Sequence, residues 1–183
     1  MEFIQQDIEG LILIKPTIYT DKRGYFAETF RQDLLEETVG HSLNFVQDNE
    51  SKSTKGVLRG LHYQLPPNDQ AKLVRVTEGN VLDVVVDLRK KSDTFGQYIS
   101  IELTADNKYQ LFVPRGFAHG FLVLSESATF AYKVDNYYAP HQERGITFND
   151  PTLGIDWRLP NEMLEISDKD KKLSSLSQLI SPF

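Results

Sequence analysis

GVLRGLHYQLPPNDQAKLVRVTEG, residues 56–79, is the stretch around which the fold is organised. It holds two runs whose side chains alternate as in a strand, 57–64 and 72–78, with a break at Gly60 in the first. The proline-rich turn 66–69 predicts that the second strand returns beside the first. The stretch therefore predicts a chain built on short strands joined by turns.

Three chemically active side chains are expected to meet on these strands. Arg59 and His62 are predicted to project near one another, and Lys72 to lie near His62 across the short connection. A lone histidine is usually a satisfied residue of a sheet or its rim, but two neighbouring cations favour its neutral, basic form. A base, a guanidinium and an ammonium on rigid strands suit the handling of a charged substrate. This stretch is therefore the predicted site.

Further strand-like runs recur at steady spacing along the chain. They are expected at 2–8, 11–20, 25–30, 44–50, 81–88, 97–104, 109–113, 121–125, 127–135 and 144–149. One helix is predicted over 32–39, a polar loop over 51–55, and short helical turns within 167–179. Many short strands with glycine- and proline-rich turns indicate a sandwich or barrel and not a βαβ fold. The expected architecture is a single all-β domain over residues 1–183, with a few short helices.

The composition argues against several classes of function. The chain has 183 residues, no cysteine and a formal net charge of −6. Without cysteine there is no disulfide, thiolate nucleophile or cysteine-based metal site. Lysine and arginine are scattered, which argues against a nucleic-acid surface and an anionic membrane surface but permits a local anion pocket. No apolar run approaches the ~20 residues of a transmembrane helix, and residues 1–7 lack a secretory pattern, so a cytoplasmic protein is expected.

The segment VPRGFAHG, residues 113–120, carries a PxGxxH pattern that resembles the second motif of the cupin superfamily. The first cupin motif, G(x)5HxH(x)3–4E(x)6G, has only a damaged counterpart over 56–79. Gln64 stands where its second histidine would be, and Lys72 lies where an acid is expected. Because an ammonium repels a dication, the resemblance implies a cupin shell without a metal site. His119 is either a turn residue that caps a strand or a ligand contact.

Other candidates keep two interpretations when they are judged from the residues alone. Tyr132 is more often a packing residue than a phenolic acid in a β-rich protein, and Asp170 in its charged tail is more often solvated than a partner of the base. Segment 23–28 is either an ordinary hairpin or a source of phosphate, stacking and hydrogen-bonding contacts. Segment 47–49 supplies either turn chemistry or hydrogen-bonding specificity.

A more specific resemblance comes from five longer segments. They are FVQDNESKS (45–53), GVLRGLHYQ (56–64), KLVRVTEGNVLDVVVDLRKKSDTFGQ (72–97), VPRGFAHGF (113–121) and YKVDNYY (132–138). In this order they resemble the dTDP-4-dehydrorhamnose 3,5-epimerase family, over nearly the whole chain. The resemblance implies a cupin-type jelly roll that acts as a homodimer, without a cofactor or a metal. The implied reaction inverts C3 and C5 of dTDP-4-keto-6-deoxyglucose, in the dTDP-L-rhamnose biosynthesis that serves lipopolysaccharide and cell-wall polysaccharides.

The resemblance also implies a role for individual residues. His62 would be the general base, Asp170 the carboxylate that orients it, Lys72 the stabiliser of the enolate oxygen, and Tyr132 the acid that returns a proton to the opposite face. The positions that would contact the nucleotide-sugar are Arg23, Glu28, Gln47, Asp48, Asn49, Arg59, His119, Glu143 and Lys169, with Phe26 facing the thymine or the sugar. Part of the N-terminal region would complete the site of the neighbouring subunit.

Three other functions compete with this interpretation. Relatives with the same motifs epimerise one centre only, so a single-centre 3- or 5-epimerase of a related dTDP-4-keto-6-deoxysugar is the nearest alternative. A metal-dependent cupin isomerase or dioxygenase would use His62, His119 and a carboxylate, and both Gln64 and Lys72 count against it. A non-catalytic cupin would bind the nucleotide-sugar and show no proton exchange.

Overall fold

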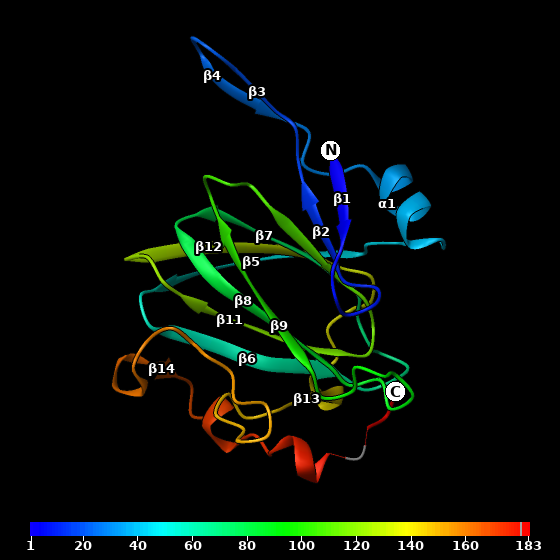
Figure 1. Cartoon of the computed structure of the whole chain (residues 1–183), viewed down its shortest axis with the longest axis vertical. Coiled ribbons are helices and arrows are strands. Elements are labelled where there is room, and N and C mark those ends of the chain that lie inside the picture. The colour runs from blue at the N-terminus through cyan, green and yellow to red at the C-terminus, as the bar shows by residue number, and fades with distance from the viewer. Residues whose placement is uncertain (180) are drawn as a thin grey trace.

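The computed structural model describes residues 1–179 and 181–183. Two sheets face each other, and the helical segments lie outside them (Figure 1). The first sheet has the order β1-β2-β10-β7-β12-β5, formed by Glu2–Gln5, Ile12–Lys15, Gln110–Val113, Lys72–Glu78, Ser127–Val134 and Gln47–Thr54. The second has the order β13-β6-β11-β8-β9, formed by Glu143–Gly145, Val57–Gln64, Phe117–Val123, Asn80–Asp87 and Tyr98–Thr104. The short β14, Glu165–Ile166, pairs in parallel with β6, and the expected all-β class is confirmed.

The core lies between the two sheets and continues beyond the second one. On β8, Val81 and Val85 pack into the space between the sheets. Val84 and Val86 point the other way and pack with Trp157 beneath the C-terminal loops. A strand buried on both faces has an almost continuous apolar sequence, which accounts for the composition of β8.

A third apolar layer covers the outer face of the first sheet. The helix α1, Gln32–Val39, buries Leu35 against Leu73 and Phe112 of that sheet. Gly40 ends the helix in a left-handed conformation with φ 76°, and its N–H donates to the carbonyl of Glu36. The predicted bounds of this helix are confirmed.

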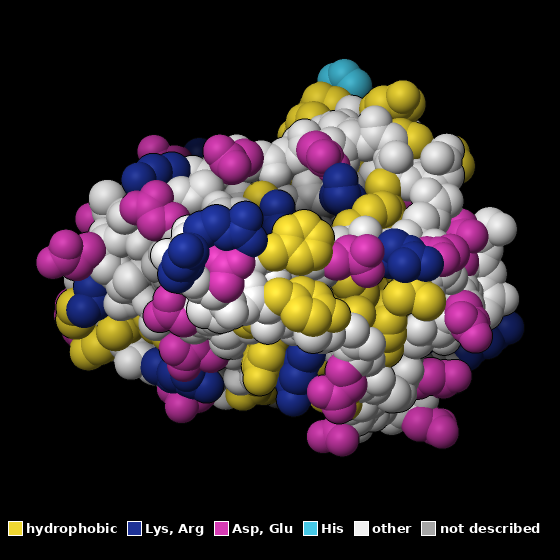
Figure 2. All heavy atoms as spheres, turned by 90° about the horizontal axis from the view of Figure 1, so that it is seen from above, with side chains coloured by type: hydrophobic (Ala, Val, Ile, Leu, Met, Phe, Trp, Pro, Cys, Tyr) yellow, Lys and Arg dark blue, Asp and Glu magenta, His cyan; other side chains and the backbone are white. Residues whose placement is uncertain are grey.

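A hairpin of β3 (Ile18–Asp21) and β4 (Gly24–Ala27) projects away from the two sheets (Figure 1). Its aromatic side chains are largely exposed, with Tyr19 at 63% and Phe26 at 67%. Figure 2 views the molecule from above and shows hydrophobic side chains gathered on this face among acidic and basic ones. Exposed aromatic surface of this kind is typical of a surface that another molecule covers.

The predicted pairing of β6 with β7 is wrong. β6 pairs with β11 and β13 in the second sheet, whereas β7 pairs with β10 and β12 in the first. The segment between them crosses from one sheet to the facing one, a distance of about 10 Å in packed sheets. A proline-rich turn between two strand-like runs predicts a hairpin equally well, so the sequence alone could not separate the two topologies.

Several predicted boundaries also differ from the structure. The polar run expected to be a loop over 51–55 continues β5 to Thr54, because the strand pairs along its whole length with β12. The strand expected over 11–20 breaks at Pro16, which has no N–H to donate. β11 begins at Phe117, four residues before the expected strand, and 144–149 is reduced to β13. Short helical turns at 170–172 and 176–178 confirm those expected in the tail. No helix of the described residues is both long and apolar enough to cross a membrane.

Candidate active site

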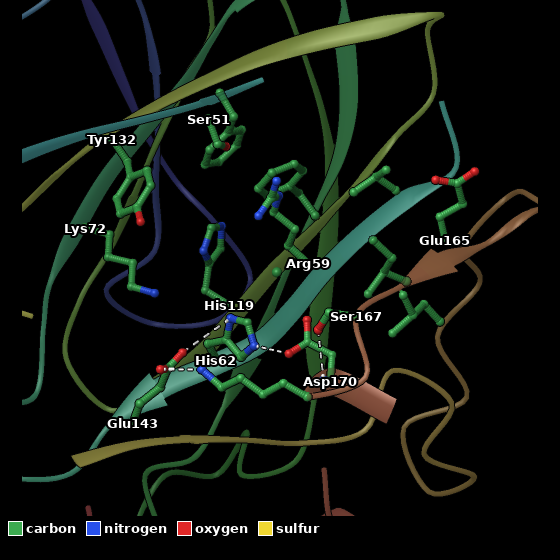
Figure 3. A pocket seen from close by; sticks show the side chains of 17 residues that line it. Ser51, Arg59, His62, Lys72, His119, Tyr132, Glu143, Glu165, Ser167 and Asp170 are labelled. Carbon is green, nitrogen blue, oxygen red and sulfur yellow. Dashed lines mark hydrogen bonds and ion pairs between the residues drawn. The ribbon is translucent and has the colours of Figure 1, made fainter. Parts of the chain in front are cut away.

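A cavity of about 580 Å³ opens between the two sheets. Its walls carry most of the polar side chains singled out in the sequence, and Figure 3 shows them pointing toward one another. These residues are Arg59, His62, Lys72, His119, Tyr132, Glu143, Lys169 and Asp170.

His62 and Asp170 form a hydrogen-bonded pair on one wall. His62 Nε2 lies 2.7 Å from Asp170 Oδ1, and the N–H of Gly60 donates to Asp170 Oδ2 at 3.3 Å. Burial alone would raise the pKa of Asp170, but the hydrogen bonds from His62 and the Gly60 N–H, together with the charge of Lys169, hold that pKa below its ordinary value. An ionised carboxylate can only accept, so Nε2 carries the proton and Nδ1 is left as the basic atom.

Asp170 reaches His62 from a distant part of the chain. Glu165–Ile166 pairs with Val57–Leu58 at the start of β6, and this parallel contact lays the tail along the strand that carries His62. The turn Asp170–Lys172 follows a few residues later, with the Asp170 side chain almost fully buried. The solvated-loop interpretation of Asp170 is therefore wrong.

A second histidine–carboxylate pair lies on the neighbouring strands. His119 Nε2 is 2.9 Å from Asp83 Oδ2, and both side chains are buried. His119 sits within β11 directly opposite His62 of β6, so the turn-cap interpretation of His119 is wrong. Asp83 was missed in the sequence analysis. The signal was present, because Asp83 is an acid flanked on both sides by apolar residues of a buried strand.

Arg59 and His62 line the same cavity although they are three residues apart on one strand. In a regular strand they would face opposite sides, but the β6–β11 register shifts between the pairs His119–His62 and Phe121–Arg59. The shift centres on Gly60, with φ 120°, where a Cβ would lie 2.6 Å from the Cα of Gly120. Only glycine fits this crossing, and the predicted proximity of Arg59 and His62 is confirmed.

Lys72 and Tyr132 come from the opposite wall of the cavity. They belong to β7 and β12 of the first sheet and point inward toward the wall of His62 (Figure 3). Burial lowers the pKa of Lys72 to about 8, against the opposing charges of Asp83 and Glu143. Burial also raises the pKa of Tyr132, so its phenol stays protonated. The cavity thus has an imidazole on one face and an ammonium and a phenol on the other.

Glu143 joins several of these groups at the mouth of the cavity. The Tyr138 hydroxyl donates to Glu143 Oε2 at 2.6 Å, and Lys169 Nζ lies 2.5 Å from the same oxygen. Glu143 Oε1 is 3.9 Å from His62 Nδ1. Burial would raise the pKa of Glu143, but the Lys169 and Tyr138 hydrogen bonds lower it. Tyr138 was also missed, and an exposed tyrosine beside a strand end gives no signal of its own.

The remaining candidates lie elsewhere. Gln47 and Asn49 are hydrogen-bonded to each other at 2.8 Å and line a smaller cavity that also contacts Tyr132 and Glu143. The carboxylate of Asp48 pairs with Lys133 outside the main cavity. Three candidates, Arg23, Phe26 and Glu28, belong to the projecting hairpin or its exit and do not line the cavity of their own chain.

Among the described residues, no three His, Asp or Glu side chains gather as metal ligands do. The two facing sheets form a cupin-type barrel, and its cavity gathers ionisable side chains of the kinds that carry out acid–base chemistry on a polar substrate.

Comparison with known proteins gives the family. The sequence profile of dTDP-4-dehydrorhamnose 3,5-epimerase matches residues 5–178. The dTDP-4-dehydrorhamnose 3,5-epimerase of Shigella flexneri is 52% identical over 170 residues, 93% of each chain. The chain therefore belongs to the dTDP-4-dehydrorhamnose 3,5-epimerase family, which confirms the resemblance found in its motifs.

Solved structures of the family agree with this fold. The dTDP-4-dehydrorhamnose 3,5-epimerase of Elizabethkingia anophelis superposes with a TM-score of 0.94 at 48% identity, over 97% of both chains. The dTDP-6-deoxy-D-glucose-3,5-epimerase of Legionella pneumophila, in complex with dTDP-4-keto-L-rhamnose, superposes with a TM-score of 0.93 at 48% identity, over 97% of this chain and 94% of that one. The expected cupin-type jelly roll is confirmed.

Proposed function

We infer that the chain is an isomerase that inverts C3 and C5 of dTDP-4-keto-6-deoxyglucose in dTDP-L-rhamnose biosynthesis. The observation that carries this inference is the division of the cavity, with His62 and Asp170 on one sheet and Lys72 and Tyr132 on the other. A nucleotide-sugar fits because the related Legionella protein binds dTDP-4-keto-L-rhamnose.

The two reacting protons of this substrate are both α to the C4 ketone. His62 Nδ1 removes the proton from one face, and the electron pair moves through the new C=C bond onto the ketone oxygen. Lys72 faces that oxygen and stabilises its developing negative charge, usually the largest single catalytic effect. Tyr132 then gives its proton to the carbon from the opposite face and becomes a phenolate. Exchange with solvent then removes the proton from His62 and returns one to Tyr132, and a second cycle inverts the other carbon.

Asp170 acts on the reaction through His62. Its carboxylate fixes the tautomer with the proton on Nε2 and stabilises the imidazolium that forms when Nδ1 takes the substrate proton. The Gly60 N–H and the Ser167 hydroxyl, 3.1 Å from the Asp170 N–H, hold this turn in place. The base is therefore set before substrate arrives.

The nucleotide end needs cations and hydrogen-bond donors. Arg59 and Lys169 line the cavity and offer these contacts to the diphosphate, with His119, Gln47 and Asn49 nearby. We propose that the projecting hairpin, with Arg23, Phe26 and Glu28, reaches the cavity of a second copy in a homodimer. Its exposed aromatic rings are consistent with a covered position in the assembly. We further propose that residues 1–183 act as one domain in the cytoplasm.

Proton exchange in D₂O tests this function. The protein would be incubated with dTDP-4-keto-6-deoxyglucose without added metal, and C3–H and C5–H would be followed by NMR. Deuterium is expected at both carbons in the wild type and at neither in His62→Ala. Exchange at one carbon only would indicate a single-centre epimerase. No exchange with retained binding would indicate the non-catalytic cupin, and activity lost to a chelator would indicate the metal-dependent one.

A further inference from the structure

Gln64 is a buried residue that the mechanism above does not use. It follows His62 by two positions on β6 and is 4% exposed. It stands where a metal-binding cupin would carry its second histidine. In this chain its side-chain amide is engaged in three hydrogen bonds, all to backbone atoms.

Two of these bonds flank Tyr138. Gln64 Nε2 donates to the carbonyl of Tyr137 at 3.3 Å, and Gln64 Oε1 accepts the N–H of Ala139 at 2.7 Å. The amide therefore holds the backbone on both sides of Tyr138. The N–H of Tyr138 itself donates to Gln47 Oε1 at 3.2 Å, so the position of this residue is fixed from two directions.

The third bond ties this segment to the one that leads to Lys72. Gln64 Nε2 also donates to the carbonyl of Asn68 at 2.6 Å. The same two segments meet again where the N–H of Ala71, the residue before Lys72, donates to Asp135 Oδ1 at 2.6 Å. The crossover between the sheets and the loop that carries Tyr138 are thus joined through one side chain.

We propose that Gln64 is a positioning residue for the epimerisation: it holds Tyr138, and through the Tyr138–Glu143 hydrogen bond it keeps Glu143 beside His62. The proposal rests on the proposed function. A side-chain amide suits this task because it donates and accepts at once, whereas a carboxylate lacks the donor and an aliphatic side chain lacks both. At the position where a metal-binding cupin carries a ligand, Gln64 instead forms hydrogen bonds to three backbone groups.

The competing interpretation is that Gln64 only satisfies backbone groups in the interior. A double-mutant cycle separates the two, since residues that act through one another show non-additive losses. The variants are Gln64→Met, Tyr138→Phe and the double variant, with Trp157→Phe as the control. Trp157 loses a buried hydrogen bond to the carbonyl of Phe148 in that variant, and its side chain does not line the cavity.

The assay is the D₂O exchange and the steady-state rate, measured well below the melting temperature of each variant. Gln64→Met is expected to lower kcat about 10- to 100-fold, with a smaller change in KM, because Glu143 lies 3.9 Å from His62 Nδ1 and its displacement would disturb the proposed base. When Gln64→Met is added to Tyr138→Phe, it is expected to lower kcat by less than about threefold. Trp157→Phe is expected to lower the melting temperature and to leave kcat within about twofold.

The proposal is overturned if Gln64→Met keeps kcat within about threefold of the wild type. It is also overturned if the fold-loss of kcat in the double variant equals the product of the fold-losses in the two single variants. Gln64→Glu, which keeps the acceptor for Ala139, is the second variant, and failure of both to fold would assign Gln64 to structure alone. A wild type without any exchange would refute the proposed function instead. A crystal structure of Gln64→Met then decides the positioning role separately, by whether Tyr138 has moved away from Glu143.

Discussion

His62 with Asp170 and His119 with Asp83 are two histidine–carboxylate pairs on neighbouring strands, with Nε2–oxygen distances of 2.7 and 2.9 Å. The His62 side chain is 26% exposed and turns Nδ1 toward Glu143 and the cavity, whereas the His119 side chain is 7% exposed and its ring stacks against Phe130. We therefore propose that the surroundings of the second ring nitrogen, and not the hydrogen bond to a carboxylate, decide which of the two histidines acts as the base.

The largest expected effect separates the two histidines. His62→Asn is expected to lower kcat by about 10²–10⁴-fold, because it removes the proton acceptor. His119→Asn is expected to lower kcat by less than about 10-fold and to act mainly on KM, since His119 is proposed to contact the substrate. Steady-state kinetics of both variants measure this contrast. Equal losses of kcat would mean that both histidines move protons.

The two aspartates give the next contrast. Asp170→Asn is expected to lower kcat by roughly 10²-fold or more, because an amide no longer stabilises the His62 imidazolium or fixes its tautomer. The matched variant Asp83→Asn is expected to keep kcat within about 10-fold, since its partner His119 is proposed to contact the substrate and not to move the proton. Single-turnover rates at saturating substrate provide the measurement. A fully active Asp170→Asn would contradict the role given to the first pair.

The pH dependence connects the second pair to the reaction through Lys72. Burial lowers the pKa of Lys72 to about 8 in the free protein, so kcat/KM is expected to fall as the pH rises through about 8 and the ammonium that would face the enolate oxygen is lost. The charge of Asp83 opposes this lowering, so Asp83→Asn is expected to move the fall to lower pH. Lys72→Arg, whose guanidinium stays protonated, serves as the control and is expected to lack the fall. A wild-type profile that stays flat to pH 9.5 would refute the assignment.

The same pKa predicts how stability depends on pH. Between about 8 and 10.5 the unfolded chain holds a proton on Lys72 that the folded chain has released. The unfolded state therefore binds more protons, and the free energy of unfolding is expected to rise with pH across this window because of this group. Denaturant unfolding of the wild type and Lys72→Met at pH 7.5 and 10 measures the difference. An equal change in the free energy of unfolding between pH 7.5 and 10 in both proteins would contradict this prediction.

The smallest expected effect concerns the buried second pair and stability. Asp83→Asn is expected to lower the free energy of unfolding by about 1–3 kcal/mol, because it weakens a buried hydrogen bond to His119. Asp170→Asn is expected to cost less, since its partner His62 keeps contact with water at the cavity mouth. Urea unfolding of the two variants compares them. A larger loss of unfolding free energy in Asp170→Asn than in Asp83→Asn would contradict the prediction that the more deeply buried pair contributes more to stability.

Local sequence was enough to find the wall of the cavity formed by β6. Arg59 and His62 belong to one short strand, and their proximity follows from the break at Gly60. Lys72 was expected near His62 and lines the same cavity, but the reason given was wrong, because the two residues face each other across two sheets. Short-range sequence patterns thus predicted which residues line the cavity, but not how the two sheets bring them together.

Long-range contacts lay beyond the pattern. The Asp170 carboxylate reaches His62 over 108 residues, through a two-residue parallel pairing that no periodicity announces. Asp83 lies in β8, which is buried on both faces. Apolar residues therefore follow one another along the strand, and the sequence does not show which face Asp83 is on. Only the family resemblance gave Asp170 and Tyr132 a role, since their surroundings are set by tertiary structure.

The long sequence separation between His62 and Asp170 has a consequence during synthesis of the chain. Ribosomes add about 5–20 residues per second, so the carboxylate is made roughly 5–20 s after the histidine it serves, 108 residues earlier. During that interval the residues of β6 exist, but the strands β11 and β13 that pair with it, and the carboxylate that orients His62, are still being made. The hydrogen bond that orients His62 can therefore form only after Asp170 has left the ribosome, so a nascent chain without Asp170 is expected to lack most of the activity of the finished one.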